Sequence, residues 1–338
     1  MTCVFDNRWI GEYGIGRFAL EVKNRLIVTN FDGYGRPMSS FDPFLQSLLF
    51  VKYNSNTWFL SPGYNAPLLS KIPYILTIHD INHIDRPENS SFLKRLYYST
   101  ILKRLCKNSR GILTVSNFSK DRISDWFYIS KDKIFNVGNG VSEIFYQSEK
   151  KSRNNDDYVL CVSNRRGHKN EKSVLESFAK SLLPPTFKLV LTGSRTSELH
   201  NLAQSLGISE RIIFTGHISE FELADLYSGA FLLLFPSFYE GFGLPIAEAF
   251  ASGTPVITSN VTSMPEIAGD AALLVNPNAI DEIISAINHL YESPQLRTTL
   301  IERGRERAQS FSWDAVAERV RAAVHSVDND PHHPLNWT

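Results

Sequence analysis

The stretch FPSFYEGFGLPIAEAFASGTPVI, residues 235–257, contains two glutamates, Glu240 and Glu248, on either side of a glycine-rich turn. The apolar run at 231–235 predicts a buried strand, and Pro245 is typical of the first turn of a helix. Backbone N–H groups of the turn and the amino-terminal end of that helix would then point to one place, which suits a diphosphate. Carboxylates beside it could accept hydrogen bonds from hydroxyls. The segment therefore predicts an enzyme that handles a nucleotide-sugar.

This segment resembles the Glu-x7-Glu motif of the retaining glycosyltransferases of family 4, and the resemblance extends over almost the whole chain. It implies an α/β protein of the GT-B fold, in which two Rossmann-like domains with parallel sheets face each other across a cleft. It also implies transfer with retention of anomeric configuration and without a metal cofactor. An isolated pair of glutamates is more often a solvated loop acid and a helix-end acid, but the glycines, the proline and the strand favour a site.

Composition excludes several other classes of protein. The 338 residues have a 43% hydrophobic share and a formal net charge of zero, from 35 basic and 35 acidic residues, so no global field attracts nucleic acid. Cys3, Cys106 and Cys161 are far apart and lack metal-ligand spacing, which is typical of reduced thiols. Neither a signal peptide nor a membrane-spanning run is recognisable, so we expect a cytoplasmic protein.

Strand and helix patterns alternate along the chain, which predicts parallel sheets covered by helices on both faces. Apolar runs predict strands at 25–29, 74–78, 111–115, 134–137, 158–162, 187–192, 211–214, 231–235, 255–258 and 272–275. Helical periodicity is found at 92–107, 119–127, 171–182, 220–228, 279–292, 295–309 and 313–327. We expect an acceptor-binding domain at 1–150 and a donor-binding domain at 151–311. The family resemblance implies that a final helix at about 312–327 packs back on the first domain.

A second anion signal follows the predicted strand at 158–162, where the sequence reads SNRRGHKN. It lies at the carboxyl end of a strand, where α/β folds bind ligands. The resemblance implies that a basic pair here neutralises the donor diphosphate. Lys169 is the lysine of that pair, and Arg165 is the better arginine candidate, with Arg166 as the alternative. A solvated basic turn is the competing interpretation.

The glycines Gly14 and Gly16, followed by Ala19, match a dinucleotide-binding fingerprint and support a rival hypothesis, an NAD-dependent oxidoreductase. The preceding predicted strand, at about 2–5, ends too early for a Rossmann turn. The cluster instead resembles the glycine-rich loop of family 4 enzymes, which reaches over the donor from the opposite domain. Glycine there lets backbone approach phosphate without a Cβ in the way.

His79 and Asp80 close the predicted strand at 74–78. The family resemblance implies that His79 contacts the donor sugar near the reacting centre. His83 competes for this role, and a histidine bonded to backbone is the structural alternative. The only Asp-x-Asp pattern, at 328–330, lies in a polar tail, so we predict no metal site.

The resemblance also implies roles for the residues of the opening segment. Glu248 would bind the ribose hydroxyls, Glu240 would hold sugar hydroxyls, and N–H groups of Phe242, Gly243 and Leu244 would contact sugar or phosphate. The pattern is most similar to bacterial mannosyltransferases that use GDP-mannose to build surface polysaccharide. A UDP-sugar or deoxysugar donor, and a protein that binds a nucleotide-sugar without turnover, remain alternatives.

A basic stretch, FLKRLYYSTILKRLCKNSR at 92–110, contains no acidic residue. A basic amphipathic helix can lie on an anionic membrane, which would suit a glycan acceptor linked to a polyprenyl diphosphate. The alternative is a helix whose apolar side packs on the sheet while its basic side is merely solvated.

Overall fold

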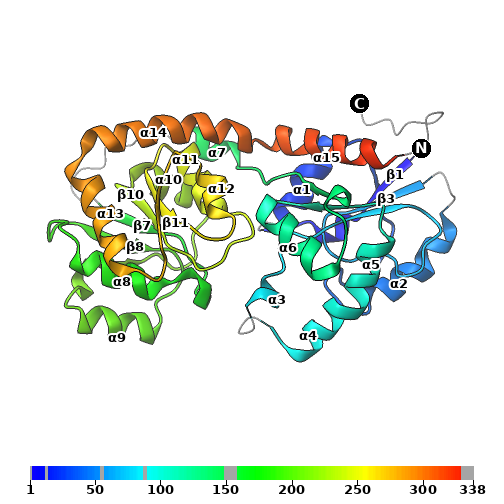
Figure 1. Ribbon diagram of the computed structural model, residues 1–338, viewed down its shortest axis with the longest axis horizontal. Coiled ribbons are helices and arrows are strands. Elements are labelled where there is room, and N and C mark those ends of the chain that lie inside the picture. The colour runs from blue at the N-terminus through cyan, green and yellow to red at the C-terminus, as the bar shows by residue number, and fades with distance from the viewer. Residues whose placement is uncertain (1, 12–13, 54–56, 87–89, 148–157, 329–338) are drawn as a thin grey trace. The chain divides into compact units, whose positions relative to one another are not determined.

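The structure is a computed structural model that describes residues 2–11, 14–53, 57–86, 90–147 and 158–328. The chain divides into two compact units, an N-terminal unit of Met1–Gly140 joined by the helix from Trp313 onward, and a C-terminal unit of Val141–Ser312. Both units are α/β with a parallel sheet, as the sequence predicts (Figure 1). The expected domain boundary at residue 150 and the polar tail from 329 lie outside the described residues.

The N-terminal sheet has the strand order β2-β1-β3-β4-β5-β6, and every neighbouring pair is parallel. Its strands are β1 (Thr2–Phe5), β2 (Thr29–Asn30), β3 (Thr57–Ser61), β4 (Tyr74–Thr77), β5 (Gly111–Thr114) and β6 (Ile134–Asn136). Its helices are α1 (Ile15–Arg25), α2 (Asp42–Leu49), α3 (Asn82–Asp85), α4 (Phe92–Tyr97), α5 (Lys103–Asn108), α6 (Asn117–Phe127) and α15 (Trp313–Val327).

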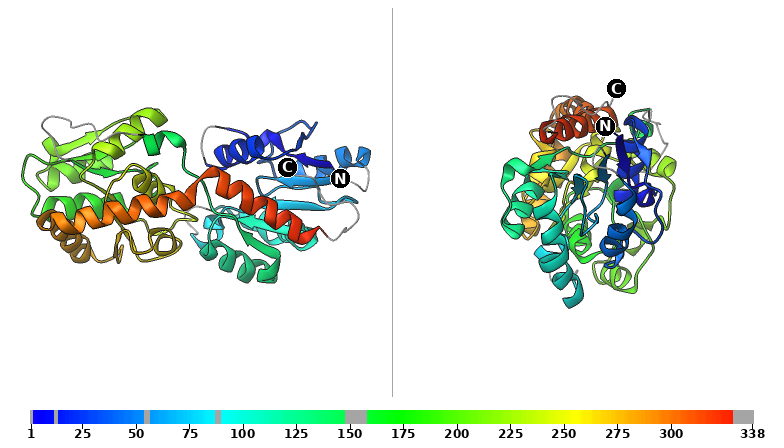
Figure 2. Two further views of the ribbon diagram at one scale, coloured as in Figure 1. Left: turned by 90° about the horizontal axis from the view of Figure 1, so that it is seen from above. Right: turned by 90° about the vertical axis from the view of Figure 1, so that its right-hand side faces the viewer.

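Helices cover both faces of the N-terminal sheet. Successive strand residues point to opposite faces, so each strand contributes to both cores. Phe5 of β1 packs in the cluster that includes residues of α1 and α15, whereas Val4 packs in the cluster that includes residues of α5 and α6. Helix α15 lies beside α1 on the same face, as the red and dark blue helices in Figure 2 show. The last helix of the chain thus completes the core of the first unit.

The C-terminal sheet has the order β12-β11-β10-β7-β8-β9 and is also parallel throughout. Its strands are β7 (Tyr158–Cys161), β8 (Lys188–Leu191), β9 (Ile212–Phe214), β10 (Leu232–Phe235), β11 (Val256–Ser259) and β12 (Leu273–Val275). Its helices are α7 (Glu143–Gln147), α8 (Glu171–Lys180), α9 (Ser197–Ser205), α10 (Glu220–Gly229), α11 (Leu244–Ala251), α12 (Met264–Ala268), α13 (Ile280–Glu292) and α14 (Pro294–Ala308).

Strand order in the C-terminal sheet reverses between β7 and β10. The chain builds outward from β7 through β8 to β9, and then returns to place β10 on the other side of β7. Ligands of open α/β sheets bind at the carboxyl ends of the strands on either side of such a switch point. The loops after β7 and β10 therefore occupy the position where a ligand is expected.

Two predictions about strands differ from the structure. The strand expected at 25–29 is wrong, because α1 continues to Arg25 and only Thr29–Asn30 joins the sheet. Helix α1 instead buries one side, including Phe18 and Val22, against the sheet. Strand β3, Thr57–Ser61, was not predicted although all of its residues are buried. A short buried run has no alternating pattern that would distinguish it from other apolar segments.

Candidate active site

The two loops at the switch point are joined by buried hydrogen bonds. Asn170, which follows the basic loop after β7, is buried and donates from Nδ2 to the carbonyls of Pro236 at 2.9 Å and Pro277 at 2.8 Å. The N–H of Phe238 donates to the carbonyl of His168 at 2.8 Å. Removing the amide of Asn170 would leave buried carbonyls without partners, so these bonds fix the two loops against each other.

The turn between β10 and α11 is shaped by glycine and serine. Gly243 has a φ of 102°, a left-handed conformation that favours glycine, and α11 begins at the next residue, Leu244. Ser263 Oγ donates to the carbonyls of Glu240 at 2.9 Å and Phe242 at 2.8 Å. The N–H groups of Phe242, Gly243 and Leu244 donate to no acceptor in the part of the chain that the structure describes. They are therefore available to an anion, as helix N-termini often are.

Lys169 and Glu240 meet at this point. Lys169 Nζ lies 2.8 Å from Glu240 Oε1, and the two side chains are only 10% and 12% exposed. The ammonium group also lies 4.8 Å from the centre of the Phe235 ring, at the end of β10. The structure thus brings together one predicted residue from each loop. A cation and a carboxylate held side by side can bind a phosphate and a sugar hydroxyl respectively.

Glu248 has a different partner, which the sequence did not reveal. Its Oε2 accepts a hydrogen bond of 2.8 Å from the hydroxyl of Tyr227, a fully buried residue of α10 whose ring packs against Phe145. Burial raises the pKa of Glu248 to about 7, although the bond from Tyr227 opposes that shift. Tyr227 lies in the predicted helix at 220–228 and carries no sequence signal that separates it from an ordinary core tyrosine.

Arg165 points to protein partners in the structure. Its Nε donates to the carbonyl of Ser194 at 2.8 Å, its Nη2 donates to the carbonyl of Gly193 at 3.0 Å, and it forms an ion pair with Glu171. Arg165 therefore ties the loop after β7 to the loop after β8. Arg166 is exposed and forms no ion pair within the described ranges.

In the N-terminal unit, His79 follows β4. Its Nε2 lies 3.2 Å from the carbonyl of Pro62, and its ring meets the Phe18 ring edge-on at 4.9 Å between centres. Burial lowers the pKa of His79 to about 4, so the imidazole is neutral at pH 7. His83 lies in α3 with its ring 6.3 Å from that of Tyr98.

The glycine cluster does not form a dinucleotide-binding turn. Strand β1 ends at Phe5 and α1 begins only at Ile15, so α1 does not follow the strand directly. Residues 12 and 13 between them lie outside the described residues. Gly14 precedes α1 with a φ of 55°. A Cβ on Gly16 would lie 2.7 Å from the backbone of Gly11, so this turn closes tightly. A Rossmann turn would start at the strand's end.

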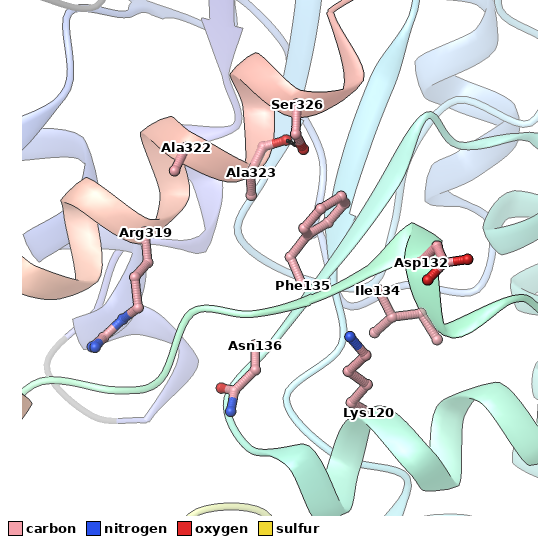
Figure 3. A pocket seen from close by; sticks show the side chains of 9 residues that line it. All are labelled: Lys120, Asp132, Ile134, Phe135, Asn136, Arg319, Ala322, Ala323 and Ser326. Carbon is pink, nitrogen blue, oxygen red and sulfur yellow. Dashed lines mark hydrogen bonds between the residues drawn. The ribbon is translucent and has the colours of Figure 1, made fainter.

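A cavity of about 420 Å³ lies elsewhere in the N-terminal unit, beside α15 (Figure 3). It is lined by Lys120, Asp132, Ile134, Phe135, Asn136, Arg319, Ala322, Ala323 and Ser326. None of the predicted site residues belongs to this lining. Arg319 is held there by a bond of 2.8 Å from its Nε to the carbonyl of Val137. Side-chain chemistry therefore favours the switch point over this cavity as the candidate active site.

Comparison with known proteins gives two family matches. The family described as "Glycosyl transferases group 1" matches residues 143–307, and the one described as "Glycosyltransferase Family 4" matches residues 50–143. The O-antigen chain mannosyltransferase B of Escherichia coli is 32% identical over 256 residues, covering 71% of this chain and 67% of that protein. The O-antigen chain mannosyltransferase RfbU of Salmonella typhimurium is 31% identical over 247 residues, covering 72% and 67%.

Solved structures share the fold at low sequence identity. HepE of Anabaena, determined in complex with UDP and glucose, has a TM-score of 0.77 at 18% identity and covers 96% of this chain and 100% of its own. A sucrose-phosphate synthase of Thermosynechococcus elongatus has a TM-score of 0.73 at 18% identity, with 97% and 99% covered. With two parallel α/β units, both family matches and a relative aligned over two thirds of its length, this chain belongs to the family 4 glycosyltransferases and has the GT-B fold.

Proposed function

We propose that this glycosyltransferase transfers mannose from GDP-mannose to a glycan or lipid-linked acceptor in the synthesis of a bacterial surface polysaccharide. Both relatives are O-antigen mannosyltransferases, which supports the choice of mannose and of surface polysaccharide synthesis. The observation that carries the proposal is the Lys169–Glu240 pair at 2.8 Å at the switch point, because a cation suits a phosphate and the carboxylate beside it suits sugar hydroxyls.

The donor would lie along the carboxyl ends of β7 and β10. Glu248 would accept hydrogen bonds from the ribose, and the open N–H groups of Phe242, Gly243 and Leu244 would bind phosphate or sugar oxygens. Glu240 would hold sugar hydroxyls and orient the reacting carbon. We assign acceptor binding to the N-terminal unit, with His79 and the Gly14–Gly16 loop as its contributors to sugar contact. Because His79 is neutral, it would act through hydrogen bonds rather than charge.

Sugar transfer would occur with retention on one face of the ring. The bond from the anomeric carbon to the donor phosphate breaks, a bond from that carbon to the acceptor oxygen forms, and the acceptor proton passes to the departing diphosphate oxygen. Lys169 would stabilise the charge on that diphosphate, and a preorganised contact of this kind contributes about 2–4 kcal/mol at the transition state. We propose that no metal ion is needed, since cationic side chains and the α11 amino terminus supply the stabilisation.

The second cation at the diphosphate would come from Arg165 or Arg166. Arg165 would have to leave two carbonyls and Glu171 in order to reach a ligand. Arg166 is exposed beside it and has no such bonds to break. The geometry therefore favours Arg166 as the phosphate contact and Arg165 as the residue that holds the loop in place.

A panel of nucleotide-sugars tests the donor by thermal shift and by donor hydrolysis. We expect GDP-mannose to stabilise the protein most, and Lys169→Ala and Glu240→Ala to abolish transfer without unfolding it. Lys172→Ala is the matched control, because that side chain is 74% exposed on α8. Activity should also survive EDTA. Wild-type turnover in both site variants would contradict the proposed site.

Other outcomes of the same panel separate the alternatives. Stabilisation by a UDP-sugar or a deoxysugar nucleotide would keep the reaction class and change the donor; HepE, with its bound UDP and glucose, makes UDP-sugars the first alternative to screen. A protein that binds the donor but neither hydrolyses it nor transfers the sugar to any glycan acceptor would be a non-catalytic binding protein.

The basic stretch divides into two parts in the structure. Helix α4, Phe92–Tyr97, has no buried residue, whereas the π-helical turn and α5 after it bury Tyr98, Leu102, Leu105 and Cys106 in the core. Within the described ranges, no helix is long and apolar enough to cross a bilayer. We propose that the protein works at the cytoplasmic face of the membrane and that Lys94 and Arg95 of α4 attract it to anionic lipid. Salt-sensitive pelleting with anionic vesicles tests this contact.

A further inference from the structure

Helix α2 turns its polar side toward the core of the N-terminal unit. Asp42 and Gln46 are buried, and Gln46 donates to Asp42. Arg8, itself nearly buried, reaches Asp42 Oδ1 at 2.8 Å and Asp6 Oδ2 at 2.7 Å. Rotating the helix would carry Asp42 away from Arg8 and break the two hydrogen bonds, of 2.8 and 3.2 Å, that Arg8 donates to it inside the unit. This buried ion network therefore fixes which side of α2 faces water.

The side that faces water is apolar. Phe41, Phe44, Leu48 and Val51, spaced at three and four residues, are 77%, 49%, 75% and 84% exposed. Leu69 lies next to them, since its N–H donates to Ser47 Oγ at 3.0 Å, and it is also exposed. We call Phe41, Phe44, Leu48, Val51 and Leu69 the α2 surface. Single exposed apolar residues are ordinary, but a stripe with helical spacing on the solvent side of a helix marks an interaction site.

The exposed charges in the segment that carries the α2 surface are mostly basic. Between residues 33 and 78 the only acidic residue is Asp42, which is buried. Arg36, Lys52 and Lys71 are all exposed in the same segment. Lys52 has one acidic neighbour, Asp32, at 3.2 Å. Residues 33–78 thus expose an apolar stripe and three basic side chains but no acid, and the one nearby acid, the exposed Asp32, pairs with Lys52. This combination complements an anionic lipid surface better than a protein surface of mixed charge.

We propose that the α2 surface inserts into the interfacial region of an anionic membrane and anchors the enzyme there. This inference rests on the proposed lipid-linked acceptor and adds to it an apolar anchor separate from the basic helix α4. The two contacts differ in physical character. Attraction through Lys94 and Arg95 should weaken as salt rises, whereas burial of apolar side chains should not.

Co-sedimentation of the full chain with phosphatidylcholine vesicles, with and without phosphatidylglycerol, tests the anchor. We expect the Phe41→Ser/Leu48→Ser double variant to bind at least about tenfold more weakly, and to lose the binding that remains at high salt. The fold should survive, because both side chains are exposed. Phe221→Ser is the matched control, since that residue is 75% exposed on α10 of the other unit, and it should bind as the wild type does. Lys94→Ser/Arg95→Ser should lose only salt-sensitive binding.

Three results would overturn the anchor. One is a wild-type protein that does not sediment with anionic vesicles, and another is a double variant that binds as well as wild type. The third is a wild-type dimer in sedimentation velocity that the double variant abolishes, which would assign the α2 surface to a second copy of the chain. Thermal shift with nucleotide-sugars, measured on the same variants, reports the donor site separately, so failure of the anchor is distinguishable from failure of the proposed reaction.

Discussion

At the scale of single residues, the Glu248 carboxylate depends on Tyr227 for its orientation. The hydroxyl of Tyr227 donates to one oxygen, Oε2, at 2.8 Å, which leaves Oε1 for a ligand. Burial raises the pKa of Glu248 to about 7, from an ordinary value of 4.5. Because the folded pKa is the higher one, the contribution of Glu248 to stability is lost as pH rises from 4.5 toward 7. Donor binding should respond in the opposite direction, since the ionised carboxylate is the better acceptor for ribose hydroxyls.

We therefore predict that affinity for an intact nucleotide-sugar rises as pH passes through about 7. Tyr227→Phe should move this transition to higher pH, because its hydrogen bond stabilises the ionised form, and should weaken binding at neutral pH about tenfold. Calorimetric titration over a pH series, with the ribose donor and its 2′-deoxy analogue, measures both effects.

Two control variants separate loss of the Glu248 orientation from a general loss of stability in that experiment. Tyr146→Phe removes a tyrosine bond of 2.7 Å to the carbonyl of Ala308 in the same unit and should leave the profile unchanged. Glu248→Gln should remove the pH dependence of donor affinity, because an amide does not ionise. Equal losses for the ribose and 2′-deoxy donors in Tyr227→Phe would show that Tyr227 is only a packing residue.

At the scale of elements, the start of α11 depends on Gly243. Its φ is 102°, and an added Cβ would lie 3.1 Å from Ile246 Cδ1. The same backbone conformation opens the neighbouring N–H groups toward the proposed phosphate. A side chain here would strain the turn and shift these donors together.

We predict that Gly243→Ala destabilises the protein by about 1–2 kcal/mol and also weakens nucleotide-sugar binding. Gly207→Ala is the control, because Gly207 has a φ of 70° with nothing within 4 Å of its Cβ position. In chemical denaturation, Gly207→Ala should lower the free energy of unfolding by a comparable amount. Its affinity for the nucleotide-sugar should be unchanged. If both variants bind donor like the wild type, the turn is not the phosphate site.

Elements also differ in how far the sequence could predict them. The turn before α11 could be predicted because glycine, proline and a strand occur together in one short stretch. Strand β3 could not, because its identity depends on pairing with β1 and β4. Helix α2 could not be oriented either: periodicity shows that a helix has an apolar side but does not say which side is buried, and the Arg8 network decided that here.

At the scale of the whole molecule, the N-terminal unit is discontinuous in sequence. Helix α15 buries Trp313, Val316 and Val320 in the core of that unit, on the face shared with α1. A Cβ on Gly140 would lie 2.2 Å from the Trp313 ring, so the two segments approach closely. The first unit can therefore be completed only after α15 has been synthesised.

We predict that a chain ending at Ser312 has a misfolded or protease-sensitive N-terminal unit, because the apolar face under α15 becomes exposed. A chain ending at Asp328 is the control and should resist proteolysis like the full chain. Limited proteolysis with mass spectrometry measures the difference. Native-like protection of residues before Gly140 in the shorter chain would show that α15 is dispensable.

The sequence by itself determined the reaction class and the architecture. The Glu240–Glu248 segment is local, as are the alternating strand and helix patterns and the basic loop with Lys169, so these could be recognised along the chain. Tertiary structure decided which of these groups meet. Pairing of β7 with β10 brings Lys169 against Glu240, and pairing of β7 with β8 places the carbonyls of Gly193 and Ser194 beside Arg165. Packing of α10 on α11 brings the hydroxyl of Tyr227 to Glu248. A parallel sheet joins strands that are far apart in sequence, and no local sequence pattern encodes which strands become neighbours.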